Sequence, residues 1–251
     1  MNVPLKWLSE YVELPKTVGE LTAKLTMVGH MLDKVKEVNG ETVVDLELRG
    51  NRADMFGLIG VARDIAACFE TSLNLPEIAK MPKIDPNMSL LSIDKSIGKI
   101  VKRYSAIKLS VKVGPSPKWL SERLEAYGIP SVNNVVDITN YVMVETSHPL
   151  HAFDFDKISG GKLILRKAKN GEKFDTIQQG TTLTLSSDDL VMADNKAVQC
   201  LSIIGGFHSG VSNETKNIIL ESAVYDSASC RRTARRLKVF TEGGSRHEKH
   251  Q

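Results

Sequence analysis

The sequence has few cysteines and no long apolar run, and each shortage excludes a class of protein. Only three cysteines occur in 251 residues, widely spaced and without a Cys-x-x-Cys pair, so neither a disulfide framework nor a zinc ribbon is predicted. No segment approaches the ~20 consecutive apolar residues that a membrane helix requires. The N-terminus lacks a basic region followed by an apolar stretch, the mark of a signal peptide. We therefore expect a cytoplasmic protein without a membrane partner.

Several motifs of common enzymes are missing as well. The chain has neither a Gly-x-Ser-x-Gly nucleophile elbow nor a Gly-x-x-x-x-Gly-Lys-Ser/Thr phosphate loop. The glycine-rich stretch IIGGFHSG, residues 203–210, lacks the lysine that would make it a phosphate site. Without Cβ atoms, however, Gly205 and Gly206 can line a pocket or expose a backbone N–H.

Histidines occur in two close pairs. His148 and His151 flank Pro149, and His247 and His250 lie at the C-terminal end. Both pairs are three residues apart, whereas two zinc ligands on one helix face are spaced four apart. No third ligand accompanies either pair at a suitable spacing. The sequence thus predicts no metal site and no cofactor.

The charge is mildly positive, and basic residues gather near the C-terminus. The formal net charge is +3, with 41% hydrophobic and 25% charged residues, ordinary values for a soluble globular protein. The segment RRTARRLK contains five basic residues in eight positions: Arg231, Arg232, Arg235, Arg236 and Lys238. Taken alone, this run favours a solvent-exposed helix face, with RNA contact as the alternative.

Hydrophobic patterning predicts helices and a strand in the first part of the chain. A helix carrying Trp7, Leu8 and Tyr11 should end before Pro15. Thr17 and Glu20 form a capping-box pattern for a second helix, with an apolar face of Leu21, Leu25 and Val28. A strand is expected over residues 42–50, followed by a helix that begins at Asn51 or Asp54. Residues 75–98, with three prolines, are interpreted as a linker.

Strands dominate the second part. Alternation predicts strands over 103–113 and within five later segments between residues 162 and 225. A short helix over 115–128 would have Ser116 as N-cap and Gly128 as terminator. A last helix is expected from Ser227 to Lys238. The pattern is that of an α+β protein with a small domain at residues 1–90 and a strand-rich domain at 91–251.

Glu221 stands out within the strand NIILESAVY. Strict alternation points its side chain the same way as Ile219 and Ala223, toward the apolar face. A buried carboxylate is costly unless it is paired or binds a polar ligand. Either Glu221 serves a functional site, or the strand lies at an edge with this side chain in water.

Longer segments resemble one family. SVNNVVDITNYVMVETSHPLHAFD, IIGGFHSGVSNETKNIILESA and CRRTARRLKVFTEGGSR are similar to the B3/B4 domain of the bacterial phenylalanyl-tRNA synthetase beta subunit. VPLKWLSEYVELP and GNRADMFGLIGVARDIAA resemble the two pieces of the B1 region of that subunit. The resemblance covers essentially the whole chain in order. It assigns residues 1–90 to a B1-like domain and 91–251 to a B3/B4-like domain.

The resemblance implies an editing site that hydrolyses tyrosine wrongly esterified to phenylalanine tRNA. It implies that Glu221 accepts a hydrogen bond from the tyrosine hydroxyl, and that His151 with Thr139 and Asn140 positions the ester and the attacking water. Gly205, Gly206, Thr241 and Gly243 would complete the pocket. The basic run from Arg231 to Lys238 would face the phosphates of the tRNA acceptor end. The alpha subunit of the synthetase is a further expected partner.

The sequence departs from the family at several places. The tRNA-binding domain usually inserted between the two B1 pieces is absent, and no adenylation motif occurs, so no synthetase activity is expected from this chain alone. Leu201 and Ser202 replace small residues, and Gly243 replaces alanine. Two hypotheses follow. The chain is an editing hydrolase, freestanding or a piece of the beta subunit, or it is a non-catalytic relative that binds an amino acid, an aminoacyl group or a protein.

Overall fold

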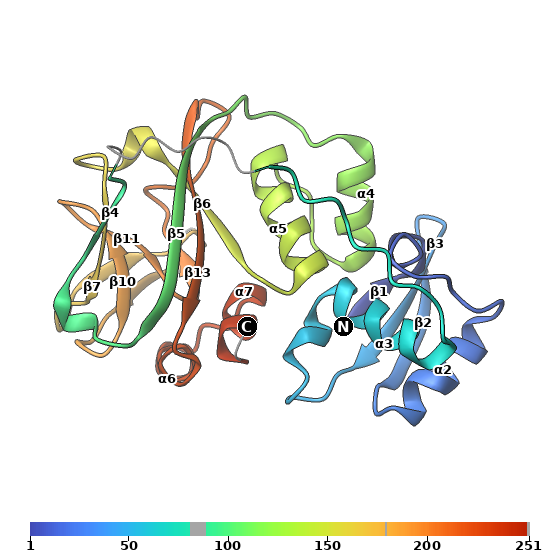
Figure 1. Ribbon diagram of the computed structural model, residues 1–251. Coiled ribbons are helices and arrows are strands. Elements are labelled where there is room, and N and C mark those ends of the chain that lie inside the picture. Colours follow the sequence, from blue (N-terminus) through green and yellow to red (C-terminus); the bar gives the residue numbers. More distant parts are fainter. Residues whose placement is uncertain (81–88, 179, 250–251) are drawn as a thin grey trace. The chain divides into compact units, whose positions relative to one another are not determined.

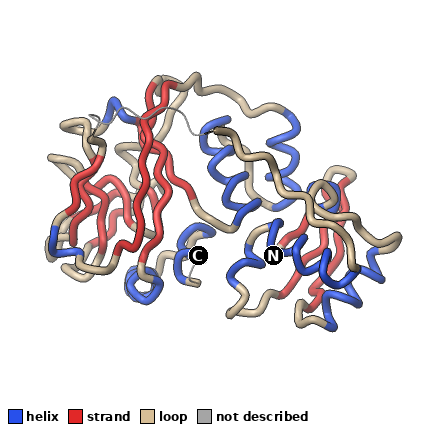
Figure 2. Tube along the Cα trace, in the orientation of Figure 1, coloured by secondary structure: helices blue, strands red, loops and turns tan. Residues whose placement is uncertain are grey.

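The computed structural model describes residues 1–80, 89–178 and 180–249, and these form helices and several small sheets (Figures 1 and 2). The mixed content confirms the expected α+β class. Residues 81–88 of the expected linker, together with Gln179, His250 and Gln251, lie outside the described residues.

The described residues gather into two compact units whose segments interleave along the chain. One unit comprises described residues within Met1–Met81 and Pro115–His148, and the other those within Pro82–Gly114 and Pro149–Gln251. Each unit has a separate apolar core. The compact units do not follow the predicted boundary at residue 90, because residues 115–148 belong to the unit that contains the N-terminus. The division into 1–90 and 91–251 concerns modules of the sequence and stays a prediction.

The first unit combines a three-stranded antiparallel sheet, in the order β1-β3-β2, with five α-helices. Its elements are β1 (Asn2–Pro4), α1 (Leu5–Leu8), α2 (Val18–Met27), β2 (Met31–Val38), β3 (Glu41–Glu47), the 3₁₀ turn η1 (Ala53–Phe56), α3 (Leu58–Phe69), α4 (Lys118–Tyr127) and α5 (Asn134–Thr146). Two hydrogen bonds join the later helices to the N-terminus. The Asn2 amide donates to the Tyr127 carbonyl at 2.6 Å, and the Tyr11 hydroxyl donates to Glu145 at 2.6 Å.

Local signals at helix ends are confirmed in part. The Thr17 hydroxyl accepts the Glu20 N–H and begins α2, as the capping pattern predicts. Gly128 ends α4 in the left-handed conformation. The prediction for Ser116 is wrong, since Pro117 is the N-cap of α4 and Ser116 instead donates to Asp137. Val28 also departs from the prediction: it is 49% exposed, because α2 has ended before it.

The second unit is built mainly of strands. Two sheets, in the orders β12-β11-β10-β7-β4 and β5-β13-β6, share one apolar core, and β8 pairs with β9. Its strands are β4 (Leu91–Ile93), β5 (Val101–Ser110), β6 (Leu150–Asp154), β7 (Leu163–Lys167), β8 (Lys173–Asp175), β9 (Thr182–Thr184), β10 (Leu190–Ala193), β11 (Val198–Leu201), β12 (Ile204–Gly205) and β13 (Asn217–Tyr225). Its helices are the 3₁₀ turns η2 (Lys95–Ile97) and η3 (Phe155–Lys157), then α6 (Ser227–Leu237) and α7 (Glu242–Glu248).

Strand β13 is central to the part of the fold that concerns function. It pairs with β5 along one side and with β6 along the other (Figure 1). Buried and half-buried residues alternate along it from Ile219 to Tyr225, so Glu221 lies on the buried face. The inward orientation expected from the sequence is confirmed.

Candidate functional site

Glu221 and His151 face each other across two neighbouring strands. They are direct partners in the antiparallel pairing of β13 with β6. Directly opposed residues of an antiparallel pair project to the same side of the sheet. Two of the residues expected from the sequence, far apart along the chain, are therefore side by side on one face.

The Glu221 carboxylate is held by two tyrosines. Its side chain is only 5% exposed. The Tyr104 hydroxyl donates to Oε2 at 2.9 Å, and the Tyr225 hydroxyl donates to Oε1 at 2.5 Å. Burial raises the pKa of Glu221 to about 7, while these two hydrogen bonds stabilise the ionised form and oppose that rise. Glu221 can therefore change its charge near neutral pH.

His151 is half-buried among its neighbours and stays neutral. Its ring meets Phe153 edge to face, with centroids 4.5 Å apart. A Cβ placed on Gly205 would lie 2.6 Å from the His151 Cε1, so the imidazole occupies space that only glycine leaves open. Burial lowers the pKa of His151 to about 4. The imidazole is therefore uncharged at neutral pH and can accept a hydrogen bond or a proton, but burial makes it a weaker base than a free histidine.

The other expected glycines and Thr241 have structural partners. A Cβ on Gly206 would lie 2.4 Å from the Gln199 carbonyl oxygen, so this glycine permits close backbone packing. The Thr241 hydroxyl donates to the Ile203 carbonyl at 2.6 Å and accepts the Gly244 N–H, which begins α7. Gly243 has room for a Cβ, whose nearest neighbour would be Pro149 at 3.5 Å.

Thr139 and Asn140 belong to the first unit. Both lie on α5, and the Thr139 hydroxyl donates to the Val136 carbonyl of the same helix at 2.7 Å. His151, Gly205 and Glu221 lie in the second unit. The described geometry of the site therefore consists of these three residues and the two tyrosines, and the roles of Thr139 and Asn140 stay predictions.

Tyr104 and Tyr225 are site residues that the sequence reasoning missed. Tyr225 could have been found, because it stands four residues after Glu221 in the same strand and so shares its face. Tyr104 could not, because it reaches Glu221 across 117 positions of sequence, through the pairing of β5 with β13.

Comparison with known proteins fits this arrangement. The model of the B3/4 domain matches residues 101–251. The chain belongs to the B3/4 domain family. This family assignment covers β13, β6 and both tyrosines of the site.

Relatives extend the likeness beyond the B3/4 region. The chain is 40% identical to the phenylalanine–tRNA ligase beta subunit of Rhodopirellula baltica over 99% of its own length, and 40% identical to that of Geobacter metallireducens over 83%. It spans only 37% and 26% of the lengths of these two relatives. The expected resemblance to the beta subunit is confirmed.

A solved structure shares the fold. An N-terminal fragment of the phenylalanyl-tRNA synthetase beta subunit from Pyrococcus horikoshii superposes with a TM-score of 0.50 at 19% identity. The match covers 97% of this chain and 74% of that fragment.

The basic run of this B3/4-family chain lies on α6, and its five members differ in their partners. All five side chains are exposed. Arg231 pairs with Glu248 at 3.4 Å, and Arg236 pairs with the buried Asp189. For the other three, no ion pair is found within residues 1–80, 89–178 and 180–249; we call Arg232, Arg235 and Lys238 the α6 stripe. Arg232 and Arg235 are neighbours on one side of α6, and Lys238 is the C-cap residue that follows the helix.

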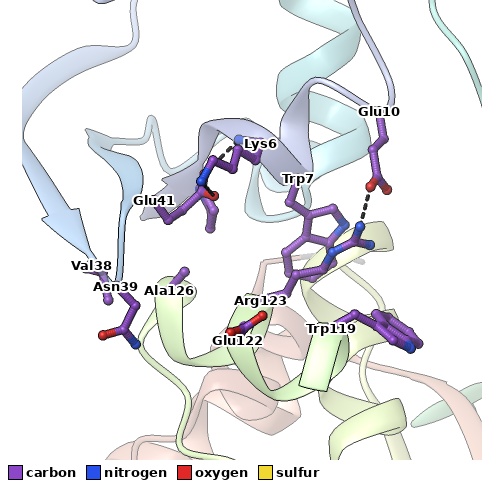
Figure 3. Close-up of a pocket in the computed structure, with 11 residues that line it drawn as sticks. Lys6, Trp7, Glu10, Val38, Asn39, Glu41, Trp119, Glu122, Arg123 and Ala126 are labelled. Atoms are coloured by element: carbon purple, nitrogen blue, oxygen red, sulfur yellow. Dashed lines mark hydrogen bonds and ion pairs between the residues drawn. The ribbon is translucent and has the colours of Figure 1, made fainter. Parts of the chain in front are cut away.

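A cavity of about 400 Å³ lies elsewhere, within the first unit (Figure 3). Trp7, Trp119 and Arg123 line it, and the Arg123 guanidinium lies near both indole rings and pairs with Glu10. The remaining charged lining residues also have partners: Lys6 with Glu41, and Glu122 with Lys118. Lys6–Glu41 joins α1 to the start of β3, Arg123–Glu10 joins α4 to the segment after α1, and Glu122–Lys118 lies within α4.

Within the part of the chain that the structure describes, no group of three or more His, Cys, Asp or Glu side chains is arranged to hold a metal ion. The helices of that same part are all too short or too polar to span a bilayer.

Proposed function

We propose that the chain hydrolyses the ester bond of tyrosine wrongly attached to phenylalanine tRNA, either as a freestanding factor or as a piece of a longer beta subunit. The observation that carries this proposal is that His151 and the buried Glu221 are direct strand partners, so that both side chains lie on one face of the β5-β13-β6 sheet. Membership of the B3/4 family and the likeness to phenylalanine–tRNA ligase beta subunits support it.

Glu221 supplies the discrimination in this proposal. A tyrosyl hydroxyl can donate to a carboxylate lone pair that Tyr104 and Tyr225 leave available, because a carboxylate offers about four acceptor sites. Phenylalanine lacks the hydroxyl and would leave that acceptor buried and unmatched. The difference amounts to ~2–4 kcal/mol, enough to spare correctly charged tRNA.

His151 supplies the chemistry. Its neutral ring accepts a proton from a water molecule as that water attacks the ester carbonyl. The bond to the tRNA oxygen then breaks, and the imidazolium returns the proton to that oxygen, which releases free tyrosine and uncharged tRNA. Ester hydrolysis is intrinsically easy, so a well-placed water beside a base suffices without a covalent nucleophile. Thr139 and Asn140 are proposed to orient the ester, on the resemblance alone.

The α6 stripe is the proposed contact with acceptor-end phosphates, since these cations lack ion pairs within the described chain. Association with an alpha subunit is proposed from the names of the relatives, which are beta subunits. Co-purification of a tagged chain with the alpha subunit of the same organism tests that association.

Two substitutions test the assignment of roles. Glu221→Ala should blur the preference for tyrosyl over phenylalanyl tRNA while hydrolysis persists. His151→Ala should reduce the rate for both esters, because it removes the base. Glu122→Ala serves as the matched control for an acidic residue outside the site. If both site variants retain the wild-type rate and preference, the assigned roles are wrong.

One observation favours a second candidate function, a non-catalytic module that binds an amino acid or an aminoacyl group. Leu201 and Ser202, where the family has small residues, are both buried and directly follow Cys200, whose strand partner is Gly205 of the site. Under this alternative the intact chain would bind tyrosine, measurable by calorimetry, without hydrolysing either ester.

A further inference from the structure

We propose that Tyr104 and Tyr225 are positioning residues for substrate discrimination: each holds one oxygen of the Glu221 carboxylate and thereby sets how strongly that carboxylate accepts the hydroxyl of a bound tyrosyl group. This inference rests on the proposed function. It names two residues that influence substrate specificity through Glu221, and it predicts a measurable effect on the ionisation of that carboxylate.

The geometry shows a carboxylate fixed from two sides. Tyr104 comes from β5 and Tyr225 from β13 itself, and each hydroxyl reaches a different oxygen of Glu221, at 2.9 Å and 2.5 Å. Two donors on two oxygens remove the rotational freedom that a glutamate side chain otherwise has. The lone pairs that remain therefore point in defined directions, as recognition of one added hydroxyl requires.

The tyrosines are themselves held in place. The Tyr225 ring meets His247 edge to face at 4.9 Å, and its hydroxyl lies 3.7 Å from the Met192 sulfur. Tyr104 packs against the apolar core of the second unit, and its pairing partner is Ala223, the residue between Glu221 and Tyr225 on the same face. Rigid donors give a hydrogen-bonded carboxylate of fixed orientation.

The ionised form of Glu221 is stabilised mainly by the two tyrosine hydroxyls, because the titratable groups around it are uncharged. Within the described residues, the titratable groups that face it are Tyr104 from β5, Tyr225 from β13, Cys200 from β11 and His151 from β6. Burial raises the pKa of both tyrosines and of the Cys200 thiol, and lowers the pKa of His151. All four are therefore neutral near pH 7. The ionised carboxylate depends on hydrogen bonds from neutral donors.

An ionised carboxylate accepts a hydrogen bond about twice as strongly as a neutral acid does. The preference for tyrosyl over phenylalanyl tRNA should therefore increase with pH as Glu221 ionises. Removing one donor destabilises the ionised form. Tyr104→Phe and Tyr225→Phe should each move this increase to higher pH, by about one pH unit.

The test is the ratio of initial deacylation rates for tyrosine and phenylalanine on phenylalanine tRNA, measured with the whole chain on both sides of the Glu221 titration. Spontaneous ester hydrolysis accelerates with pH and adds to both rates, so the buffer rate at each pH is subtracted before the ratio is taken. Tyr11→Phe is the matched control, because it removes an equally short tyrosine–glutamate hydrogen bond, to Glu145, outside the site. The carbon-13 NMR titration of the Glu221 carboxyl provides a second measurement that does not depend on catalysis.

Three outcomes are distinguished, and each one either supports or overturns the inference. A displaced midpoint in both site variants, with Tyr11→Phe unchanged, supports the inference. A wild-type ratio that increases with pH, with both variants at the wild-type midpoint and the wild-type Glu221 titration, overturns it and leaves the proposed function standing. A wild-type chain that hydrolyses neither ester overturns the proposed function and this inference with it.

Discussion

At the scale of single residues, Gly205 is the position where an added methyl group would meet the His151 ring directly. Gly205→Ala would place a methyl group 2.6 Å from the His151 ring, which must then turn away. We expect deacylation to decrease at least tenfold, with only about 1–3 kcal/mol of stability lost, since a side-chain ring and not backbone has to move.

The comparison for this variant is Gly114→Ala in the same unit, where an added Cβ meets no atom within 4 Å. Rates and melting temperatures of the two variants separate a local effect on His151 from a general effect of removing glycine. Full activity in Gly205→Ala would show that the orientation of His151 is not required.

Glu221 should leave a signature in the pH dependence of stability. Its pKa in the folded chain is about 7, raised from an ordinary 4.5. Between these values the unfolded chain has lost the proton while the folded chain keeps it, so the free energy of unfolding decreases as pH increases, and levels off above about 7. The total effect is on the order of 3 kcal/mol.

Glu221→Gln cannot titrate and should lack this decrease. Denaturant unfolding of both proteins across that range, taken as a difference, isolates Glu221. His151 contributes the opposite slope in acid, because its folded pKa is about 4, but it does so in both proteins. Parallel stability curves for wild type and Glu221→Gln would show that Glu221 titrates normally.

The sequence could predict the direction of Glu221 but not its partners. Alternation along one strand is local information, and it placed Ile219, Glu221 and Ala223 on one face. Tyr104 depends on the register between strands more than a hundred residues apart, which no local pattern encodes. The close approach of the His151 ring to Gly205 depends on the packing of β12, and no local sequence pattern predicts it either.

At the scale of elements, α6 and its C-cap carry the cations that are proposed to contact the tRNA phosphates. Arg232→Gln, Arg235→Gln and Lys238→Gln together should weaken tRNA binding and reduce the slope of log affinity against log salt by about two to three, because each phosphate contact contributes slightly less than one. Filter binding at several salt concentrations gives that slope.

Lys16→Gln, Lys24→Gln and Lys34→Gln form the matched triple variant, since they remove the same charge from exposed positions of the first unit. An equal reduction of the slope in both triple variants would mean that only net charge matters and that the α6 stripe has no special role.

Helix prediction succeeded where end signals were strong and failed where they were not. The hydroxyl cap at Thr17 and the left-handed Gly128 marked real ends. Helix α5 was not predicted, because its interior includes Val135, Val136 and Ile138, β-branched residues that favour strands. Asn133, whose side chain caps α5, was the available signal.

At the scale of the whole molecule, the site has one part defined by the structure and one part predicted from the resemblance. The second unit contains His151, Glu221 and both tyrosines, whereas Thr139 and Asn140 belong to the first. Sequence patterns could not predict that residues 115–148 pack with the N-terminal part of the chain and not with the strands. The contacts that hold them there, such as the hydrogen bond from Tyr11 to Glu145, are long-range.

The chain alone should not charge tRNA. No adenylation motif occurs in its sequence, so phenylalanine-dependent exchange of pyrophosphate into ATP is expected to stay at background. Addition of a purified alpha subunit is the control for assay competence. Exchange by the chain alone would contradict the assignment of its activity to ester hydrolysis.

The central claim is that this chain removes tyrosine, and spares phenylalanine, on the same tRNA. The most direct measurement is the deacylation of both esters by the wild-type chain, side by side, with the buffer rate subtracted. We expect rapid loss of tyrosine and a phenylalanine rate at least about thirtyfold lower, because ~2–4 kcal/mol of discrimination corresponds to roughly 30- to 900-fold in rate. Equal rates for the two esters, or no rate above buffer for either, would contradict it.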